Sequence, residues 1–174
     1  KTVIDAISPS KDVDGFHPEN CGRLMIGIEP YFYPATPQGI LMLIDEYKIP
    51  LKGKQAVVIG RSNIVGKPMA QLLLKESMNV TVLHSKTPEV EKRMFIRHAD
   101  LIVVATGHRH TLTADYELKP TAVVIDVGIN VNEEGKLEGD CDRDLPVAFQ
   151  SPVPSGVGLL TRMSVIDNLI ELSK

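Results

Sequence analysis

The chain has few cysteines, little net charge and no long hydrophobic run, and each of these absences excludes a class of protein. Its two cysteines, Cys21 and Cys141, have neither CxxC spacing nor the pattern of a disulfide framework, which favours free thiols in a reducing cytoplasm. The net charge of −3 gives no reason to expect a nucleic acid or an anionic membrane as partner. The longest apolar runs, 101–105 and 122–125, are too short to cross a membrane, and no signal peptide opens the chain.

What remains is the composition of a globular protein. The 174 residues are 43% hydrophobic, enough for one well-packed domain with a short appendage. No internal repeat or low-complexity segment is present, and the chain does not begin with Met. Near its start, Val3, Ile4 and Ile7 fit one helical face that Ser8-Pro9 interrupts. So short a helix is unstable alone, and we expect its partner surface to belong to residues outside this chain.

Short apolar stretches alternate with helical patterns over most of the sequence. Strands are predicted over 56–59, 80–83, 101–105 and 123–127, with a short edge strand over 149–152. Helices are predicted over 38–47, 68–77, 88–98 and 159–172, whereas 8–20 is turn-rich and 24–33 is irregular. Continuous apolar strands that alternate with helices predict an α/β fold, a doubly wound parallel sheet with helices on both faces.

Three of these helices carry more detailed predictions. Thr36 is a plausible N-cap of the first, with Pro37 at its first position. In the helix over 88–98, Val90, Met94 and Phe95 are predicted to face inward. The last helix has five apolar residues on one side, Leu160, Met163, Ile166, Leu169 and Ile170.

The segment 56–68 reads as a buried strand, a tight turn and a helix that begins at Pro68. Pro68 suits the first helical position because the N–H it lacks would be unsatisfied there, and Gly66 lets the backbone turn without a Cβ clash. We expect free backbone N–H groups at this helix N-terminus, where the partial positive charge favours phosphate. The segment alone is equally compatible with an ordinary strand-to-helix loop.

Small, polar or basic residues follow four of the predicted strands. Parallel sheets of this kind bind ligands beyond the carboxyl ends of their strands. The four segments are Gly60-Arg61-Ser62, His84-Ser85-Lys86, Ala105-Thr106-Gly107 and Gly128-Ile129-Asn130. Their agreement predicts a nucleotide cleft at this end of the sheet.

The end of the second strand indicates which nucleotide is bound. NAD sites usually carry Asp or Glu there, which accepts a hydrogen bond from the ribose 2′-hydroxyl. Here the strand ends without an acid, and Arg61, Ser85 and Lys86 suit a 2′-phosphate instead. The sequence therefore favours NADP over NAD. The alternative is that Arg61 and Lys86 are solvated surface charges.

Two loops and two histidines also invite a functional interpretation. The segment 11–18 is an exposed Asx turn unless it binds a ligand. In the segment 151–158, Pro stiffens the backbone and Gly lets a ligand approach closely, unless the segment is simply the entry into the last helix. His108 and His110 lack an obvious third ligand, so no metal site is predicted. We expect Asp126 and Asp140 to fix turns, and His84 to shape the 2′-phosphate pocket.

Six segments occur in the same order as in a known enzyme family. They are KDVDGFHP, PATPQG, GRSNIVGKP, LHSKT, VIDVGIN and PVPSGVG. Together they resemble the C-terminal, NADP-binding portion of the bifunctional methylenetetrahydrofolate dehydrogenase/methenyltetrahydrofolate cyclohydrolases. The resemblance implies a Rossmann-like NADP-binding domain over 36–158. It implies that 1–35 is a linker from an N-terminal catalytic domain, carrying the KDVDG loop, and that 159–174 is a C-terminal helix.

The resemblance also implies two activities for the intact enzyme. One oxidises 5,10-methylenetetrahydrofolate to 5,10-methenyltetrahydrofolate with NADP⁺, and the other hydrolyses that product to 10-formyltetrahydrofolate. The family's expected general acid/base is the Lys of a Tyr-x-x-x-Lys motif, which this chain lacks. We therefore expect no catalytic residue in this chain and no activity from it alone. The implied enzyme is a cytoplasmic homodimer of one-carbon metabolism and purine biosynthesis.

Matching the motifs position by position implies a set of site residues. Asp14 matches the carboxylate that holds the pterin ring, and Pro154, Ser155 and Gly156 would flank folate and nicotinamide. The implied cofactor-binding residues are Thr36, Gly60, Arg61, Ser62, Ile64, Ser85, Ala105, Val127, Ile129 and Thr161.

The chain departs from the family pattern in two of these motifs. Ser155 stands where the family usually has Gly, which is unfavourable if that position has positive φ. PATP replaces the commoner PCTP, as in some relatives that prefer NAD. Two alternative functions stay open: a nucleotide-binding module without catalysis, and another two-domain NADP dehydrogenase similar to shikimate dehydrogenase.

Overall fold

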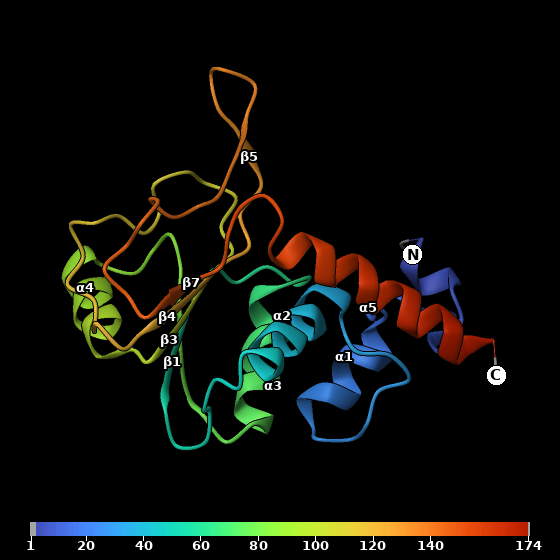
Figure 1. Ribbon diagram of the computed structural model, residues 1–174. Helices are drawn as coiled ribbons and strands as arrows, with labels where there is room; N and C mark the ends of the chain where they lie inside the picture. The colour runs from blue at the N-terminus through green and yellow to red at the C-terminus, as the bar shows by residue number, and fades with distance from the viewer. Residues whose placement is uncertain (1–2, 174) are drawn as a thin grey trace.

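A five-stranded parallel sheet forms the centre of the computed structural model, which describes residues 3–173 (Figure 1). Its strands are β1 (Gln55–Ile59), β2 (Asn79–Leu83), β3 (Leu101–Val104), β4 (Val123–Asp126) and β7 (Phe149–Gln150). They lie in the order β2-β1-β3-β4-β7, with every neighbouring pair parallel. The chain runs outward from β1 to β2 and then returns to β3 on the other side of β1. The predicted doubly wound parallel sheet is therefore confirmed.

Alternate residues of each buried strand supply two separate cores. Ala56 and Val58 pack toward α2 (Ala35–Glu46) and α3 (Gly66–Lys75), whereas Val57 and Ile59 pack toward α4 (Glu89–His98). This alternation follows from the two-residue period of a strand. Because both faces are covered, the strands can be apolar throughout. The last helix, α5 (Val157–Leu172), lies against α2 (Figure 1).

Several smaller elements surround this framework. Two 3-10 turns, η1 (Ile4–Ala6) and η2 (Pro9–Lys11), precede α1 (Pro18–Met25). A hairpin of β5 (Asn130–Val131) and β6 (Leu137–Glu138) extends away from the body of the molecule (Figure 1). Neither α1 nor the hairpin was predicted. The outermost residues of the predicted linker and of the predicted C-terminal helix, 1–2 and 174, lie outside the described residues.

Three predicted helix starts are wrong by two or three residues, and the last helix, α5, begins at Val157 rather than at Leu159. α2 begins at Ala35 with Pro34 as its N-cap, so Thr36 lies inside the first turn. The Thr36 hydroxyl instead accepts a hydrogen bond from Thr161 of α5 at 3.3 Å. α3 begins at Gly66 rather than at Pro68. Pro68 is still tolerated because it lies in the first turn, where the N–H that proline lacks would have no helical partner.

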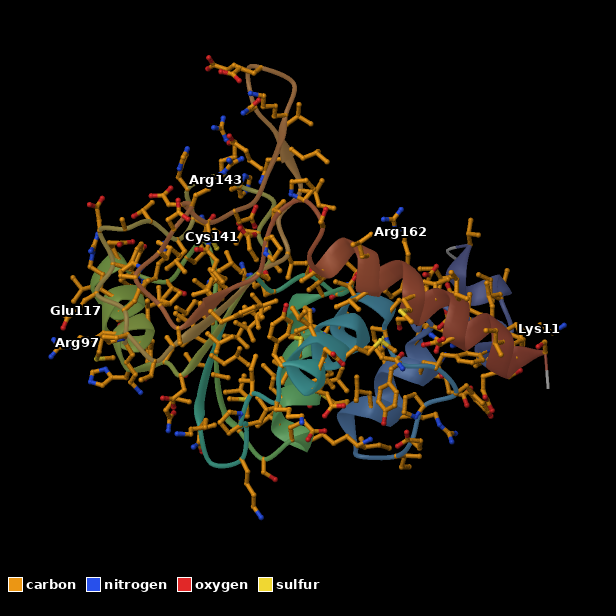
Figure 2. The ribbon with its side chains drawn as sticks, viewed as in Figure 1. Lys11, Arg97, Glu117, Cys141, Arg143 and Arg162 are labelled. Carbon is orange, nitrogen blue, oxygen red and sulfur yellow. The ribbon has the colours of Figure 1, made fainter. Side chains whose placement is uncertain are left out.

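The predicted inward face of α4 is wrong for two of its three residues. Val90 is 80% exposed and Met94 is 50% exposed, whereas Ile96 is fully buried and Phe95 partly so. At 3.6 residues per turn, Met94 points about 160° away from Ile96, so the two cannot both face the sheet. On the outer side of α4, Arg97 forms an ion pair with Glu117 at 3.4 Å (Figure 2).

The contact between α2 and α5 is polar and unusually close. A Cβ added to Gly39 would lie 2.8 Å from the backbone N of Thr161. Ser164 donates a hydrogen bond to Gln38 at 3.0 Å, and Asn168 donates to the carbonyl of Val13 at 2.8 Å. Small polar residues of α5 therefore face α2. The apolar side of α5 is about half exposed at Met163, Ile166, Leu169 and Ile170.

Replacement of Gly39 by Ala should separate these two helices. The new methyl group meets backbone atoms that cannot rotate away, and overpacking of this kind costs about 1–3 kcal/mol. Urea unfolding measures the loss. Gly22→Ala is the matched control, because it lies in α1 with open space around the added Cβ and should stabilise the protein by up to about 1 kcal/mol. Equal stability of the two variants would contradict the close contact.

Candidate functional site

Two cavities lie beyond the carboxyl ends of the strands. The first, of about 310 Å³, is bordered by the ends of β1, β2 and β3, and we name it the β1–β3 cavity. The second, of about 610 Å³, is bordered by the end of β4, the loop before α5 and the starts of α2 and α5, and we name it the β4 cavity. Their position matches the place where doubly wound sheets bind ligands.

Most of the predicted site residues line one of these two cavities. Gly60, Arg61, Ser62, Ser85 and Ala105 line the β1–β3 cavity. The β4 cavity is lined by Thr36, Val127, Ile129, Pro154, Ser155, Gly156 and Thr161. The structure therefore brings twelve of the fourteen predicted positions to one end of the sheet, in two groups.

The other two predicted residues lie elsewhere. Asp14 is exposed, and its carbonyl oxygen accepts a hydrogen bond from Ala35 at the start of α2 at 3.3 Å. The neighbouring carboxylate, Asp12, is buried and accepts hydrogen bonds from the backbone of His17 and the side chain of Asn20. Ile64 lines a separate groove of about 660 Å³. Neither Asp14 nor Ile64 touches the two cavities.

The loop between β1 and α3 is arranged differently from its prediction. Ser62 binds the backbone at the start of α3 through three hydrogen bonds: its hydroxyl accepts from Val65 and Gly66, and its carbonyl accepts from Lys67. The helix N-terminus is therefore capped from within and does not present free N–H groups. Among residues 3–173, the backbone N–H groups of Arg61 and Ser62 have no protein acceptor. The free donors lie in the loop itself.

Two glycines let this loop lie tight against the sheet. Gly60 has φ +132°, and a Cβ there would lie 2.3 Å from the carbonyl oxygen of Ala105. A Cβ at Gly66 would lie 2.3 Å from the carbonyl oxygen of Gly60. Any side chain at either position must therefore displace backbone. The glycines leave the cavity floor bare, so that a ligand can approach the main chain closely.

Positive charge dominates the β1–β3 cavity. Arg61 and Lys92 line it together with the imidazoles of His84 and His108, and within the described chain no Asp or Glu does so. The guanidinium of Arg61 has no hydrogen-bond or ion-pair partner among residues 3–173, whereas Lys92 is 3.5 Å from Glu89. This cavity suits an anionic group such as a phosphate.

The β4 cavity has no excess of positive charge, because Asp126 lines it as well as Arg162. Among the described lining residues, Arg162 is the only cation, and it projects from α5 (Figure 2). The loop before α5 contains a cis peptide bond between Val153 and Pro154. Ser155 has φ +76°, which is the condition under which a serine at this position is unfavourable. A Cβ at Gly156 would lie 2.2 Å from the carbonyl oxygen of Pro152.

Ser155 is consequently a strained residue, and Ser155→Gly should relieve the strain. A side chain with left-handed φ costs about 1–2 kcal/mol, of which glycine's greater unfolded-state entropy offsets about 0.5–1 kcal/mol. We expect a net gain in the free energy of unfolding of up to about 1 kcal/mol, measured by urea unfolding. The control, Ser155→Ala, keeps the Cβ and should give no gain. A similar gain in both variants would mean that the hydroxyl, not φ, is unfavourable.

Two buried carboxylates brace the loops around both cavities, as predicted for Asp126 and Asp140. Asp126 accepts hydrogen bonds from the backbone of Gly128, Asp140 and Cys141, each at 2.9 Å. Burial raises its pKa, although these N–H groups act in the opposite direction. Each carboxylate lies against a glycine in the other carboxylate's segment. A Cβ at Gly139 would lie 1.9 Å from Asp126 Oδ2, and one at Gly128 would lie 2.2 Å from Asp140 Oδ1.

Other lining residues were not predicted as members of the site. Lys92 and Tyr116 reach the β1–β3 cavity from α4 and from a long loop, and no local motif marks either. Burial, together with the nearby Glu89, raises the pKa of Tyr116 to about 12, so this phenol stays neutral. Thr106 also lines this cavity. It belongs to one of the four strand-end segments, and this position was the sequence signal that could have identified it.

The described part of the chain gathers no group of three or more His, Cys, Asp or Glu side chains that could hold a metal ion. Among residues 3–173, no helix has the length and apolar character needed to span a bilayer.

Comparison with known proteins agrees with the arrangement of motifs. Residues 34–174 match the family model described as the tetrahydrofolate dehydrogenase/cyclohydrolase, NAD(P)-binding domain. The bifunctional protein FolD of Burkholderia pseudomallei strain 668 is 52% identical over 175 residues, covering 99% of this chain and 60% of the relative. The chain thus spans about 60% of the length of the curated relatives that it matches.

Solved structures give the same result. The bifunctional FolD enzyme of Campylobacter jejuni superposes with a TM-score of 0.93 at 44% identity, covering 98% of this chain and 60% of that chain. The FolD of Trypanosoma brucei, solved with an NADP cofactor and an inhibitor, gives a TM-score of 0.90 at 34% identity, covering 97% and 60%. With its motifs, its parallel sheet and these matches in accord, this chain belongs to the tetrahydrofolate dehydrogenase/cyclohydrolase family and comprises that family's NAD(P)-binding domain.

Proposed function

We propose that this chain binds NADP⁺ across the two cavities. The observation that carries the proposal is the cationic β1–β3 cavity, in which Arg61 is unpaired within the described chain and no carboxylate lines the wall. The positive charge of this cavity wall would stabilise a bound 2′-phosphate. The ribose of NAD⁺, in contrast, usually binds an acidic residue at the end of the second strand. The Trypanosoma brucei relative, solved with an NADP cofactor, supports this assignment.

The predicted residues divide naturally along such a dinucleotide. Arg61 and Ser85 would hold the 2′-phosphate, with Gly60, Ser62 and Ala105 lining the adenosine side. Around the nicotinamide side would lie Thr36, Val127, Ile129 and Thr161. Ile64 is proposed as a cofactor residue from its motif alone. When bound, the nicotinamide accepts a hydride from the substrate, while these residues bind and orient it.

The reaction of the longer protein is the second part of the proposal. It oxidises 5,10-methylenetetrahydrofolate to 5,10-methenyltetrahydrofolate with NADP⁺ and hydrolyses the product to 10-formyltetrahydrofolate, in the cytoplasm. Asp14, Pro154, Ser155 and Gly156 contact folate. Residues 1–35 serve as a linker and 36–158 bind NADP⁺. The segment 159–174 follows, and its residues up to Leu172 belong to α5. A lysine outside this chain supplies the general acid/base, so the chain alone is inactive.

Titration calorimetry with NADP⁺ and NAD⁺ in parallel tests the cofactor. Tighter binding of NADP⁺ supports the proposal. Tighter binding of NAD⁺ would refute the assignment of Arg61 and Ser85, and binding of neither would refute the site. The activities are tested on the full-length protein by following NADPH formation with 5,10-methylenetetrahydrofolate and then 10-formyltetrahydrofolate. Absence of turnover with folate substrates would favour the nucleotide-binding module.

The proposed homodimer forms through the groove that Ile64 lines. Phe16, Met25 and Val82 line the same groove, and Val82 lies on β2, an edge strand of the sheet. Apolar grooves beside an open strand edge suit a self-complementary contact between two copies. Sedimentation equilibrium should give a dimer, and Val82→Arg should give a monomer. A dimer that tolerates Val82→Arg would place the contact elsewhere.

A further inference from the structure

Asp140 is a fully buried carboxylate that holds the loop following β3. Its Oδ2 atom accepts hydrogen bonds from the backbone of Thr106 at 2.7 Å, the backbone of Gly107 at 2.8 Å and the Thr106 hydroxyl at 2.9 Å. Bonds to an ionised acceptor are the strong ones. Thr106 lines the β1–β3 cavity, whereas Asp140 itself lies behind it. The carboxylate therefore shapes one cavity wall from the inside of the protein.

The other carboxylate oxygen holds the loop following β4. Oδ1 accepts a hydrogen bond from the side chain of Asn130 at 2.9 Å and lies where a Cβ of Gly128 would be. Gly128 and the adjacent Ile129 line the β4 cavity. One buried group therefore contacts the loops of both cavities, one with each oxygen.

The position of this group is itself fixed by the sheet. The backbone N–H of Asp140 donates to Asp126, the last residue of β4, at 2.9 Å. Its carbonyl oxygen accepts from the backbone of Thr111 at 2.7 Å, and Thr111 lines the β1–β3 cavity. The hydroxyls of Thr106 and Thr111 are 2.8 Å apart. The two loops and the strand thus form one continuous hydrogen-bonded unit.

We propose that Asp140 is a positioning residue that sets the spacing between the two cavities, so that both halves of one dinucleotide bind together. This inference rests on the proposed function. Two linked halves bind far more tightly than either alone when their sites are held at the matching distance, and the gain reaches about 10²–10⁴-fold. If the spacing becomes variable, that gain is lost while each half-site can still bind its own half.

The test compares a whole dinucleotide with one half of it. NADP⁺ and adenosine 2′,5′-bisphosphate are titrated by calorimetry into the chain and into Asp140→Asn. The new N–H₂ group must face either the donors on Thr106 and Gly107 or the donor on Asn130. We expect NADP⁺ to bind about 100-fold more weakly and adenosine 2′,5′-bisphosphate to change by less than about threefold. The control is Asp144→Asn, the same charge change at a nearby exposed residue, which should change neither affinity.

A second variant guards against misfolding. Asn130→Ala removes the two hydrogen bonds that its amide donates to Asp140 and to the carbonyl of Gly139, without adding a buried donor. It should weaken NADP⁺ binding about 10-fold relative to the half-ligand. Circular dichroism shows whether each variant is folded. If Asp140→Asn is not folded, the affinities of Asn130→Ala decide the role of Asp140. Equal weakening of both ligands, or no weakening of either, would overturn the role of Asp140. Failure of the unmodified chain to bind NADP⁺ would instead refute the proposed function.

Discussion

Replacement of Arg61 by Ala should weaken NADP⁺ binding by about 10- to 150-fold and leave NAD⁺ binding nearly unchanged. A hydrogen bond to a charged group contributes about 1.5–3 kcal/mol, which corresponds to that range of affinity. The guanidinium is exposed and unpaired within the described chain, so no other protein contact is lost with it. Calorimetric titration of both cofactors measures the difference.

Two further variants make this result specific. Arg61→Lys keeps the charge but loses the two-pronged geometry, so its NADP⁺ affinity should be intermediate. Arg97→Ala removes an arginine from the outer side of α4, where it pairs with Glu117, and should affect neither cofactor (Figure 2). If Arg61→Ala weakened NADP⁺ and NAD⁺ equally, Arg61 would be shaping the loop rather than binding the 2′-phosphate.

Gly60→Ala should be the most destabilising single methyl addition in the β1–α3 loop. The backbone strain of a side chain at φ +132° and the overlap with the Ala105 carbonyl together cost about 2–6 kcal/mol. Typical domains have only about 5–15 kcal/mol of stability, so the change is large. Urea unfolding followed by circular dichroism measures it.

The control for this variant also has positive φ but lacks the close contact. Gly135 has φ +76° in the β5–β6 hairpin, and a Cβ there would meet nothing within 4 Å. Gly135→Ala should therefore cost only about 1–2 kcal/mol. If the two substitutions were equally destabilising, the close approach of Gly60 to Ala105 would not contribute.

The parts of the fold that sequence predicted are those with a local physical signal. Runs such as 101–104 and 123–125 are apolar throughout because the sheet is covered on both faces, and this pattern is visible without tertiary information. The hairpin was missed because its strands have only two residues each. Its turn does have a signal, since the Asn132 side chain accepts hydrogen bonds from the backbone of Glu134 and Lys136.

Helix faces were harder to predict than strands. The apolar side chains of α4 are spread around much of the helix, at Val90, Met94, Phe95 and Ile96. Only the contact with the sheet decides that Ile96 is buried. In α5 two of the three buried residues are polar, because Ser164 and Asn168 find partners on α2 and in the loop at Val13, and the third is Val157. Tertiary packing overrides amphipathic periodicity in both helices.

The residues of the candidate site also divide into those with a local sequence signal and those placed by tertiary packing. Its strand-end residues are consecutive in sequence with buried strands, so Arg61, Ser85 and Ala105 could be grouped in advance. Lys92 and Arg162 lie within helices, and their approach to a cavity depends on how those helices pack. The internal cap of α3 by Ser62 was missed because the turn was assumed to leave the helix start free.

The crosswise fit of two carboxylates and two glycines has a consequence for how this region can evolve. A side chain at Gly128 must displace Asp140, and one at Gly139 must displace Asp126. A substitution tolerated at one of these positions thus depends on the residue at its partner, so their effects are strongly non-additive. Single substitutions at either glycine should therefore be poorly tolerated. We expect each carboxylate–glycine pair to change together or not at all.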